Sequence, residues 1–401
     1  MTFFDELITR GVVKDISSPE LKDKLNNESL TFYLGTDPTA DSLHIGHYAS
    51  FVTAKRLALH GHKPIILVGG ATGLIGDPRP TQERDTITKE LVNKNIIGLT
   101  KQIEKLLDGK AELVNNYDWT KDITYLDFLR DIGVYININY MLGKDIIARR
   151  LETGISYKEF SYTLLQGYDF LHLFREKNCV LQAAGSDQWG NITTGIELIR
   201  KIENKEAYGF TMPLILDKMG NKFGKSEGNA LWLDKEKTSP YQIYQYLINS
   251  DDTKVEEYLK VFTFLSLEEI DNIMKEQKEA PEKRIAQKAL AFEVVKDIHG
   301  IEEAEAAKKK SEEIFSNRGM SDETESKEIE YTEELKLVDF LMLTEMFPSK
   351  SEARRMVEQN AISINNEKVN NPDLLITKDM FKDNAVLVQK GKKNFKKMVL
   401  K

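Results

Sequence analysis

The stretch TFYLGTDPTADSLHIGHYASFVTAKRLALHGHKPIILVGG (31–70) decides the fold. Residues 31–37 have the composition of a β-strand that ends in a polar turn. In residues 43–60 the apolar side chains recur with the period of a helix, which is expected to end at Gly61, a typical C-terminal cap. Residues 63–70 form an apolar run broken by glycines, as in a buried parallel strand. This strand–helix–strand unit predicts an α/β fold with a doubly wound parallel sheet.

The rest of the chain divides into parts of different composition. A further strand, CVLQAAG (179–185), again runs into a polar turn and a helix, whereas the chain beyond Lys235 is charged and helix-rich. The stretch 316–334 is polar and acidic, which favours a flexible linker. The 401 residues are too many for one ordinary core. We therefore expect an α/β domain over 1–220, a helical domain over 221–315, a linker over 316–334 and a small module of helices and short strands over 335–401.

Composition excludes several classes of protein. No run of about 18 apolar residues appears, so we expect no membrane-spanning segment. Asp5 and Glu6 stand where a signal peptide would be positively charged. Cys179 is the only cysteine, which excludes an internal disulfide and a thiolate metal cluster. These features predict a cytoplasmic protein. The net charge of −8 argues against a wholly basic nucleic-acid binder, although the stretch 378–401 is locally basic.

Two of the six histidines, His44 and His47, lie three residues apart behind the first strand. A helix capped by Asp41 or Ser42 would put both imidazoles on one face of its first turns. Helix N-termini attract anions, and Gly46 between the rings lets a flat ligand approach the backbone. A zinc site would need further ligands, which the other histidines do not supply at a suitable spacing. Packing alone would explain a single histidine, but the pair favours contact with a phosphate.

The stretch MGNKFGKSEGN (219–229) is a second candidate for phosphate contact. It nearly matches a P-loop, but only three residues separate Gly220 from Gly224, and it lies far from the first strand. What remains is either an exposed basic turn or a glycine-rich loop that closes over phosphate charge. The second interpretation is favoured, and its candidate residues are Lys222, Lys225 and Ser226.

Two further stretches carry polar groups suited to a ligand site. VGGATGLIGDPRPTQER (68–84) leaves a strand through glycines and ends with Asp77, Arg79 and Arg84, of which the carboxylate could hold an ammonium group. In SYKEFSYTLLQGYDFLHLF (156–174), Ser156 and Glu159 form a capping-box pattern. Within this otherwise apolar helix, polar side chains at i, i+4 and i+7 lie on one face. Burying that face would be costly unless it lines a site, whereas a face exposed to solvent would carry no functional meaning. These polar side chains are Tyr162, Gln166 and Asp169.

Together these stretches resemble the class I aminoacyl-tRNA synthetases, whose two signatures stand here as HIGH (44–47) and KFGKS (222–226). A closer resemblance is to the bacterial tyrosyl-tRNA synthetases across roughly residues 30–300. It is carried by YLGTDPTADSLHIGH, VGGATGLIGDP, NNYDW, FSYTLLQGYDF, GSDQWGNITTG and LWLDKEKTSPYQ. The module containing SKSEARRMVEQNAISINNEKV (349–369) is similar to the RNA-binding fold of a ribosomal small-subunit protein. The resemblance implies a Rossmann-like catalytic domain, an α-helical domain on the anticodon side and a small α+β RNA-binding domain.

The resemblance also implies roles for individual residues. Tyr33 and Asp169 would hydrogen-bond the phenol hydroxyl of the substrate tyrosine. Its ammonium group would be held by Asp77, Tyr162 and Gln166, and its carboxyl end by Gln188. The nucleotide would lie against Asp37, Thr39, Gly46, Gly185 and Asp187. The ATP phosphates would be bound by the catalytic set His44, His47, Lys222, Lys225 and Ser226. RNA phosphates would be contacted by Lys390, Lys392, Lys393, Lys396 and Lys397.

The implied activity is that of a tyrosine–tRNA ligase acting on L-tyrosine, ATP and tRNA(Tyr). Mg²⁺ would enter with ATP as part of the substrate, and no protein-bound metal or organic cofactor is expected. Residues 120–152 correspond to the segment that forms the family's homodimer interface. Two alternatives remain: the tryptophanyl enzyme, which shares both signatures, and a non-catalytic RNA-binding derivative of the fold.

Two positions depart from the family pattern. The usual GDPSGK-x-x-ER is here GDPRPTQER, one residue shorter and without its lysine, so Arg79 or Arg84 would have to supply that phosphate contact. Leu34 stands where a polar or sulfur side chain is often found near the ribose, and that contact is expected to be lost.

Overall fold

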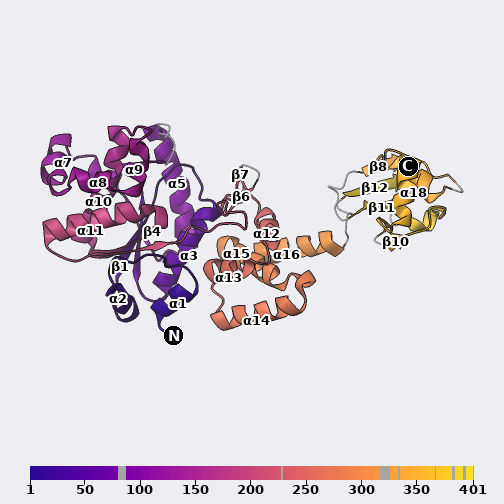
Figure 1. Ribbon diagram of the computed structural model, residues 1–401, viewed down its shortest axis with the longest axis horizontal. Helices are drawn as coiled ribbons and strands as arrows, with labels where there is room; N and C mark the ends of the chain where they lie inside the picture. Colours follow the sequence, from indigo (N-terminus) through magenta and orange to yellow (C-terminus); the bar gives the residue numbers. More distant parts are fainter. Residues whose placement is uncertain are drawn as a thin grey trace. The chain divides into compact units, whose positions relative to one another are not determined.

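The computed structural model describes residues 1–79, 87–226, 229–316, 326–332, 335–365, 367–381, 384–391 and 394–400. The chain divides into two compact units, Met1–Ala304 and Glu305–Lys401 (Figure 1). Among the described residues, none of the helices has the length and apolar content needed to cross a bilayer.

The first unit is built on a parallel sheet. Its described strands are β1 (Thr31–Thr36), β2 (Lys63–Val68), β3 (Glu112–Asn115), β4 (Cys179–Gly185) and β5 (Tyr208–Met212). Their order is β3-β2-β1-β4-β5, and each neighbouring pair is parallel. From β1 the next strands, β2 and β3, are added on one side, and from β4 the next strand, β5, is added on the other side. The strand order therefore reverses between β1 and β4. The predicted doubly wound α/β fold is confirmed, and its switch point is the place where such sheets bind ligands.

Helices cover both faces of this sheet, with the strands drawn between the two groups in Figure 1. Tyr33 and Leu67 share a buried cluster with Phe170 of α10 (Tyr157–Lys177) and Leu198 of α11 (Trp189–Glu203), so α10 and α11 cover one face. The crossovers α3 (Ile45–Leu59) and α5 (Lys89–Leu106) run the other way from the switch point, and right-handed connections put them on the opposite face. The shorter helices of the sheet region are α1 (Phe3–Thr9), α2 (Leu21–Asn27), α4 (Thr72–Ile75), α6 (Tyr117–Thr120), α7 (Tyr125–Asp131), η1 (Gly133–Tyr135), α8 (Ile138–Leu142), α9 (Asp145–Leu151) and η2 (Ser186–Gln188).

A helical segment, residues 240–299, follows the antiparallel pair β6 (Lys225–Ser226) and β7 (Asn229–Ala230). It contains α12 (Pro240–Ile248), α13 (Val255–Phe262), α14 (Leu267–Glu279), η3 (Pro281–Lys283) and α15 (Ile285–His299), and α16 (Ile301–Ser316) comes next. Ser239 and Ser266 begin α12 and α14 with capping boxes. Tyr48 of α3 donates its hydroxyl to Asp297 of α15 at 2.7 Å, and Lys55 of α3 pairs with the same carboxylate at 2.8 Å. The helix that carries HIGH is therefore bonded directly to the helical segment.

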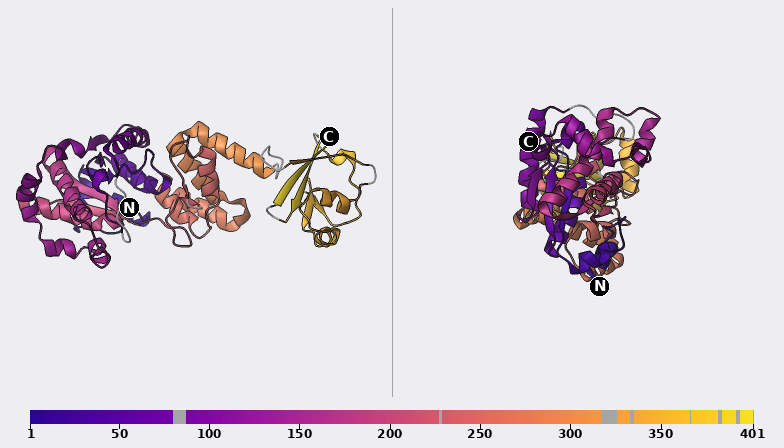
Figure 2. Two further views of the ribbon diagram at one scale, coloured as in Figure 1. Left: turned by 90° about the horizontal axis from the view of Figure 1, so that it is seen from above. Right: turned by 90° about the vertical axis from the view of Figure 1, so that its left-hand side faces the viewer.

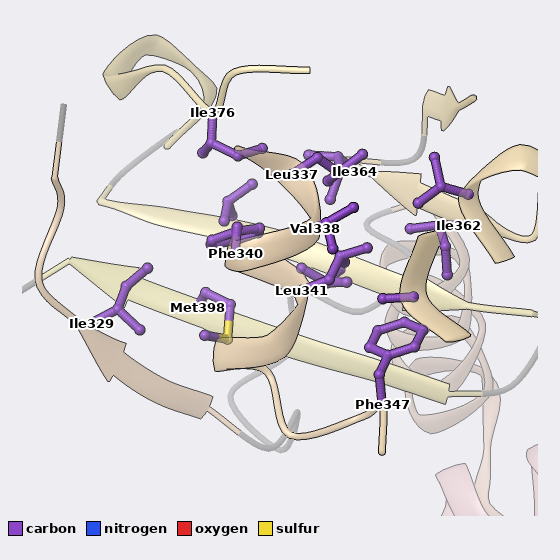
Figure 3. Close-up of a cluster of buried hydrophobic side chains, with 14 of the residues drawn as sticks. Ile329, Leu337, Val338, Phe340, Leu341, Phe347, Ile362, Ile364, Ile376 and Met398 are labelled. Carbon is purple, nitrogen blue, oxygen red and sulfur yellow. The ribbon is translucent and has the colours of Figure 1, made fainter. Parts of the chain in front are cut away.

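The second unit contains another sheet, in the order β10-β9-β11-β12-β8. Its strands are β8 (Ser326–Ile329), β9 (Ile362–Ile364), β10 (Glu367–Val369), β11 (Ala385–Lys390) and β12 (Asn394–Leu400), with helices α17 (Leu337–Leu343), α18 (Lys350–Glu358) and η4 (Lys378–Met380). Phe340 and Leu341 of α17 pack with Ile362, Ile364 and Met398 of the sheet (Figure 3). Both α-helices contribute to this core, and the helices lie on one face of the strands (Figure 2).

Strand β8 lies inside the stretch 316–334, for which the sequence favoured a flexible linker. It pairs in parallel with β12 and buries Ile329. The linker prediction is therefore wrong for residues 326–329. The strand is short and mostly polar, because it lies at the sheet edge and only one of its side chains enters the core.

Candidate active site

A cleft of about 520 Å³ opens at the carboxyl ends of β1 and β4. Its lining brings together side chains from the sheet, from α10, from the first turn of α3 and from the KFGKS stretch. The predicted site residues that line it are Tyr33, Asp37, Thr39, His44, Gly46, His47, Asp77, Arg79, Tyr162, Gln166, Asp169, Gly185, Asp187, Gln188 and Lys222.

The structure does not describe the side chains of five predicted site residues. Arg84, Lys392 and Lys393 lie outside the described residues. Lys225 and Ser226 form β6, but only their backbone is described.

The deep end of the cleft holds a buried carboxylate and a buried phenol. Asp169 accepts hydrogen bonds from Asn116 Nδ2 and from Trp119 Nε1, both at 2.9 Å. Burial raises the pKa of Asp169 to about 7, although these two donors act against the rise. The hydroxyl of Tyr33 is also buried and has no hydrogen-bond partner among the described residues. An unpaired buried hydroxyl is costly, so this end of the cleft suits a ligand hydroxyl.

The middle of the cleft contains two more carboxylates. Asp37 accepts hydrogen bonds from the Tyr162 hydroxyl at 2.9 Å and from Thr72 Oγ1 at 2.8 Å. Asp77 accepts one from Gln188 Nε2 at 3.0 Å. Because the negative charges of Asp37 and Asp77 face a common space lined by polar side chains, this part of the cleft suits a cationic group.

The outer end of the cleft is formed by the two histidines of HIGH. Their rings stack with centroids 3.8 Å apart. His44 Nδ1 accepts a hydrogen bond from the Gly46 N–H at 3.1 Å, and His47 Nδ1 accepts one from the His44 N–H at 3.3 Å. Burial, followed by the charge of His44, lowers the pKa of His47 to about 3, so its ring is neutral near pH 7. In a neutral ring whose Nδ1 is an acceptor, Nε2 carries the proton and is the donor available to an anion.

This arrangement corrects the predicted helix cap. The N-cap of α3 is His44 itself, and neither Asp41 nor Ser42 caps the helix. Ser42 Oγ instead donates to the Leu43 carbonyl at 2.8 Å, while Asp41 pairs with Lys237. An imidazole acceptor thus takes the place of the usual hydroxyl or carboxylate cap, which a search for Ser, Thr, Asp or Asn overlooks.

The KFGKS stretch (222–226), here called the signature loop, lies against the start of α3. The Ile45 N–H donates to the Leu231 carbonyl at 2.8 Å, just beyond the loop. Gly224 has φ +85°, and a Cβ at this position would lie only 2.2 Å from Ile45 Cγ2. Glycine is therefore required here both by conformation and by space. The contact brings Lys222, exposed at the cleft, to the same ligand space as His44 and His47.

Several contributors to the site were not assigned by sequence reasoning. Asn116 and Trp119 fall in NNYDW, a stretch that carried the resemblance without roles for its residues. Asn191 Nδ2 lies 2.8 Å from Gln188 Oε1 and 3.0 Å from Gln166 Oε1, so it orients both amides. Arg150 donates to the Arg79 carbonyl at 2.8 Å and forms a buried ion pair with Glu159, also at 2.8 Å. Arg150 thereby fixes the turn that follows Asp77.

Of the predicted lysines described in the second unit, Lys390 and Lys396 make contacts within the unit itself. Lys396 is only 6% exposed, and both Met398, two residues on in its strand, and Val388, opposite it in β11, belong to the core. Lys390 Nζ donates to the Met346 carbonyl at 2.7 Å and lies over the Phe347 ring. Direct phosphate contact is therefore not favoured for Lys396, because its side chain lies inside the unit. Lys397, on the opposite face of β12, is partly exposed.

No group of three His, Cys, Asp or Glu side chains in the described part of the chain could hold a metal ion.

Comparison with known proteins places the chain among synthetases. Residues 25–316 match the family model "tRNA synthetases class I (W and Y)", and residues 317–398 match "Tyrosine--tRNA ligase SYY-like C-terminal domain". The chain is 47% identical over 412 residues to a tyrosine–tRNA ligase of Bacillus velezensis, with 98% of each chain covered. It is 43% identical over 406 residues to one from Clostridium botulinum, with 99% of each covered.

Two similar solved structures each align with about three-quarters of the chain. A C-terminally truncated mitochondrial tyrosyl-tRNA synthetase of Aspergillus nidulans aligns with a TM-score of 0.70 at 34% identity, covering 78% of this chain and 94% of that one. A tryptophanyl-tRNA synthetase of Encephalitozoon cuniculi aligns with a TM-score of 0.55 at 16% identity, covering 76% of this chain and 87% of that one. The second likeness is one of fold alone.

Proposed function

The chain belongs to the tyrosine–tRNA ligase family of class I tRNA synthetases, and from that premise we propose that its cleft joins L-tyrosine to tRNA(Tyr) in two steps. In the first, the tyrosine carboxylate attacks the α-phosphorus of ATP, which enters with Mg²⁺, and pyrophosphate leaves. In the second, a hydroxyl of the terminal tRNA adenosine attacks the carbonyl of tyrosyl-adenylate and AMP leaves. Neither step needs a covalent enzyme nucleophile, so catalysis rests on positioning and on stabilising phosphate charge.

The observation that carries the choice of tyrosine is the deep end of the cleft. The unpaired Tyr33 hydroxyl and the Asp169 carboxylate are a donor and an acceptor suited to one phenol hydroxyl. A site built around a hydroxyl rejects phenylalanine, because phenylalanine would leave these buried groups unpaired; tyrosyl-tRNA synthetase is itself the standard example of this rule. The ammonium group of the substrate would lie between Asp77, Tyr162 and Gln166, with Gln188 toward its carboxylate.

The outer end of the cleft would hold ATP. His44 and His47 each use Nδ1 as an acceptor and so offer Nε2 donors at a helix N-terminus, and Lys222 adds a positive charge from the facing loop. We assign the phosphates to these three residues together with Lys225 and Ser226. The nucleoside would lie against Asp37, Thr39, Gly46, Gly185 and Asp187. Arg79, which lines the cleft, is the candidate for the phosphate contact of the missing family lysine.

A homodimer is the proposed assembly. The segment 120–152 exposes large apolar side chains, with Leu126 75% exposed, Val134 71% and Ile138 65%. An apolar surface of this kind is typical of a subunit interface. We expect the protein to sediment at twice the chain mass of 45.9 kDa and Leu126→Glu with Val134→Lys to sediment as a monomer. Ile97→Glu, at an exposed apolar position on α5, should remain dimeric.

The domain roles follow the same proposal. Residues 1–220 would bind tyrosine and ATP, residues 221–315 would carry the signature loop and the anticodon-side helices, and the module over 335–401 would bind RNA. Within that module Lys397, with Lys392 and Lys393, is proposed to contact tRNA phosphates. Lys390 and Lys396 would act through packing.

Amino-acid-dependent exchange of pyrophosphate into ATP tests the activity. Exchange should depend on tyrosine and stay at background with tryptophan and with phenylalanine. Exchange with tryptophan alone would favour the tryptophanyl alternative. Binding of tRNA without any exchange or charging would favour the non-catalytic alternative and overturn the proposal.

A further inference from the structure

The signature loop is held at its centre, between its two lysines, by aromatic side chains of the helical segment. Phe223 is buried, and its ring centroid lies 4.7 Å from those of Phe262 and Tyr258. The next residue, Gly224, donates its backbone N–H to the hydroxyl oxygen of Tyr246 at 2.9 Å. A phenol from α12 thus holds the backbone of the loop directly.

The backbone around this bond is otherwise held mainly by neighbouring strand-like segments. The Phe223 N–H donates to the Ile215 carbonyl at 3.0 Å, and the Leu231 N–H donates to the Gly224 carbonyl at 3.2 Å. Because Gly224 has no side chain, its torsions are set by these contacts and by the Tyr246 bond. Lys222 is two residues away and enters the cleft, whereas Tyr246 lies behind the loop, outside the described cleft lining.

We propose that Tyr246 is a positioning residue for adenylate formation: its hydroxyl holds the Gly224 N–H and so fixes the path along which Lys222 reaches the ATP phosphates. The inference rests on the proposed function. A cationic side chain stabilises a phosphoryl transition state only when it is held close to its productive place. Loss of an anchor two residues away should therefore affect the reaction step rather than the affinity for tyrosine, which binds at the other end of the cleft.

Tyr246→Phe is the test, because it removes one oxygen and keeps the ring that packs on Phe223. The rate constant for adenylate formation at saturating ATP should fall roughly three- to tenfold, the effect of one net hydrogen bond. The dissociation constant for tyrosine should stay at the wild-type value, and the unfolding temperature should fall by no more than about 4 °C, the effect of the same lost bond on stability. Tyr208→Phe is the matched control, since its hydroxyl bonds Glu20 and Glu206 far from the cleft. It should react at the wild-type rate.

A double-mutant cycle identifies the route of the effect. If Tyr246 acts through Lys222, then Tyr246→Phe should cost little further rate in a Lys222→Ala background. A wild-type rate for Tyr246→Phe, an equal cost in both backgrounds, or a fall in tyrosine affinity alongside the rate would each overturn the inference. Wild-type protein without tyrosine-dependent exchange would instead overturn the proposed function.

Discussion

Tyr33 and Asp169 are electrostatically coupled across the deep end of the cleft: burial and then the charge of Asp169 raise the pKa of the Tyr33 phenol well above its usual value. The two groups differ in their partners. Asp169 accepts two hydrogen bonds, while the Tyr33 hydroxyl has none among the described residues. The Tyr33 hydroxyl is thus a buried donor without a partner among the described residues, at the place where the substrate hydroxyl is proposed to bind.

Tyr33→Phe should separate the selectivity of the site from its stability. Removing an unpaired buried hydroxyl should leave the unfolding temperature of the unliganded protein unchanged or higher. The preference for tyrosine over phenylalanine should fall by roughly three- to tenfold, because one of two phenol contacts is lost. Thermal unfolding and pyrophosphate exchange with both amino acids measure these effects. A lower unfolding temperature with unchanged selectivity would contradict the assignment.

Asp169→Asn should change how stability depends on pH. The pKa of Asp169 is raised to about 7 by burial, from a usual value of 3.8. Between about pH 4 and pH 7 the folded protein therefore holds a proton on Asp169 that the unfolded chain has lost. The stability that Asp169 contributes is complete below about pH 4 and is lost as the pH rises through about 7. The asparagine variant should gain in unfolding temperature relative to wild type by at least about 2 °C between pH 5 and pH 8.

Comparing two pH values cancels those effects of the substitution that do not depend on pH. The bonds from Asn116 and Trp119 favour the ionised carboxylate, and their effect is already contained in the pKa of about 7. Asp23→Asn, on the surface of α2, is the control for the loss of a carboxylate that is not buried. An equal difference between variant and wild type at pH 5 and pH 8 would show that Asp169 is ionised throughout.

Regular patterns in the sequence predicted the framework, and contacts between distant elements accounted for most of what was missed. The spacing of apolar residues over 31–70 reflects interactions between residues close together in the chain. It was therefore sufficient to predict the βαβ unit and the location of His44 and His47. The partners of Asp169 were not predictable in this way. Asn116 and Trp119 lie about 50 residues earlier in the chain, and their bonds to Asp169 exist only in the folded sheet.

The burial of Lys396 could have been predicted from alternation along its strand. Lys396 and Met398 are two residues apart in β12 and so point to the same face, and Met398 is in the core. The same rule puts Lys390 of β11 on the side of Val388. A basic composition favoured RNA contact for all these lysines, but composition does not distinguish the two faces of a strand.

Lys222→Ala should slow the chemical step without weakening tyrosine binding. Lys222 is exposed at the outer end of the cleft, and the proposed phenol contacts lie at the other end. Loss of one charge that stabilises the transition state should lower the rate of adenylate formation by roughly 10- to 100-fold. Lys218→Ala is the matched control, since this nearby exposed lysine pairs with Asp251 at 2.7 Å. Equal losses in the two variants would mean that general charge, rather than the place of Lys222, supports the reaction.

Lys396 and Lys397 are adjacent in β12 but should have different roles, which matched methionine substitutions can distinguish. Methionine keeps much of the alkyl chain and removes the charge. Lys397→Met should weaken tRNA binding and reduce the slope of log affinity against log salt by about 1, because one phosphate contact is lost. Lys396→Met should leave that slope unchanged, since the side chain is only 6% exposed, while Lys396→Ala should lower the unfolding temperature of the second unit through lost packing. A reduced slope for Lys396→Met would instead make Lys396 a phosphate contact that emerges from the core when RNA binds.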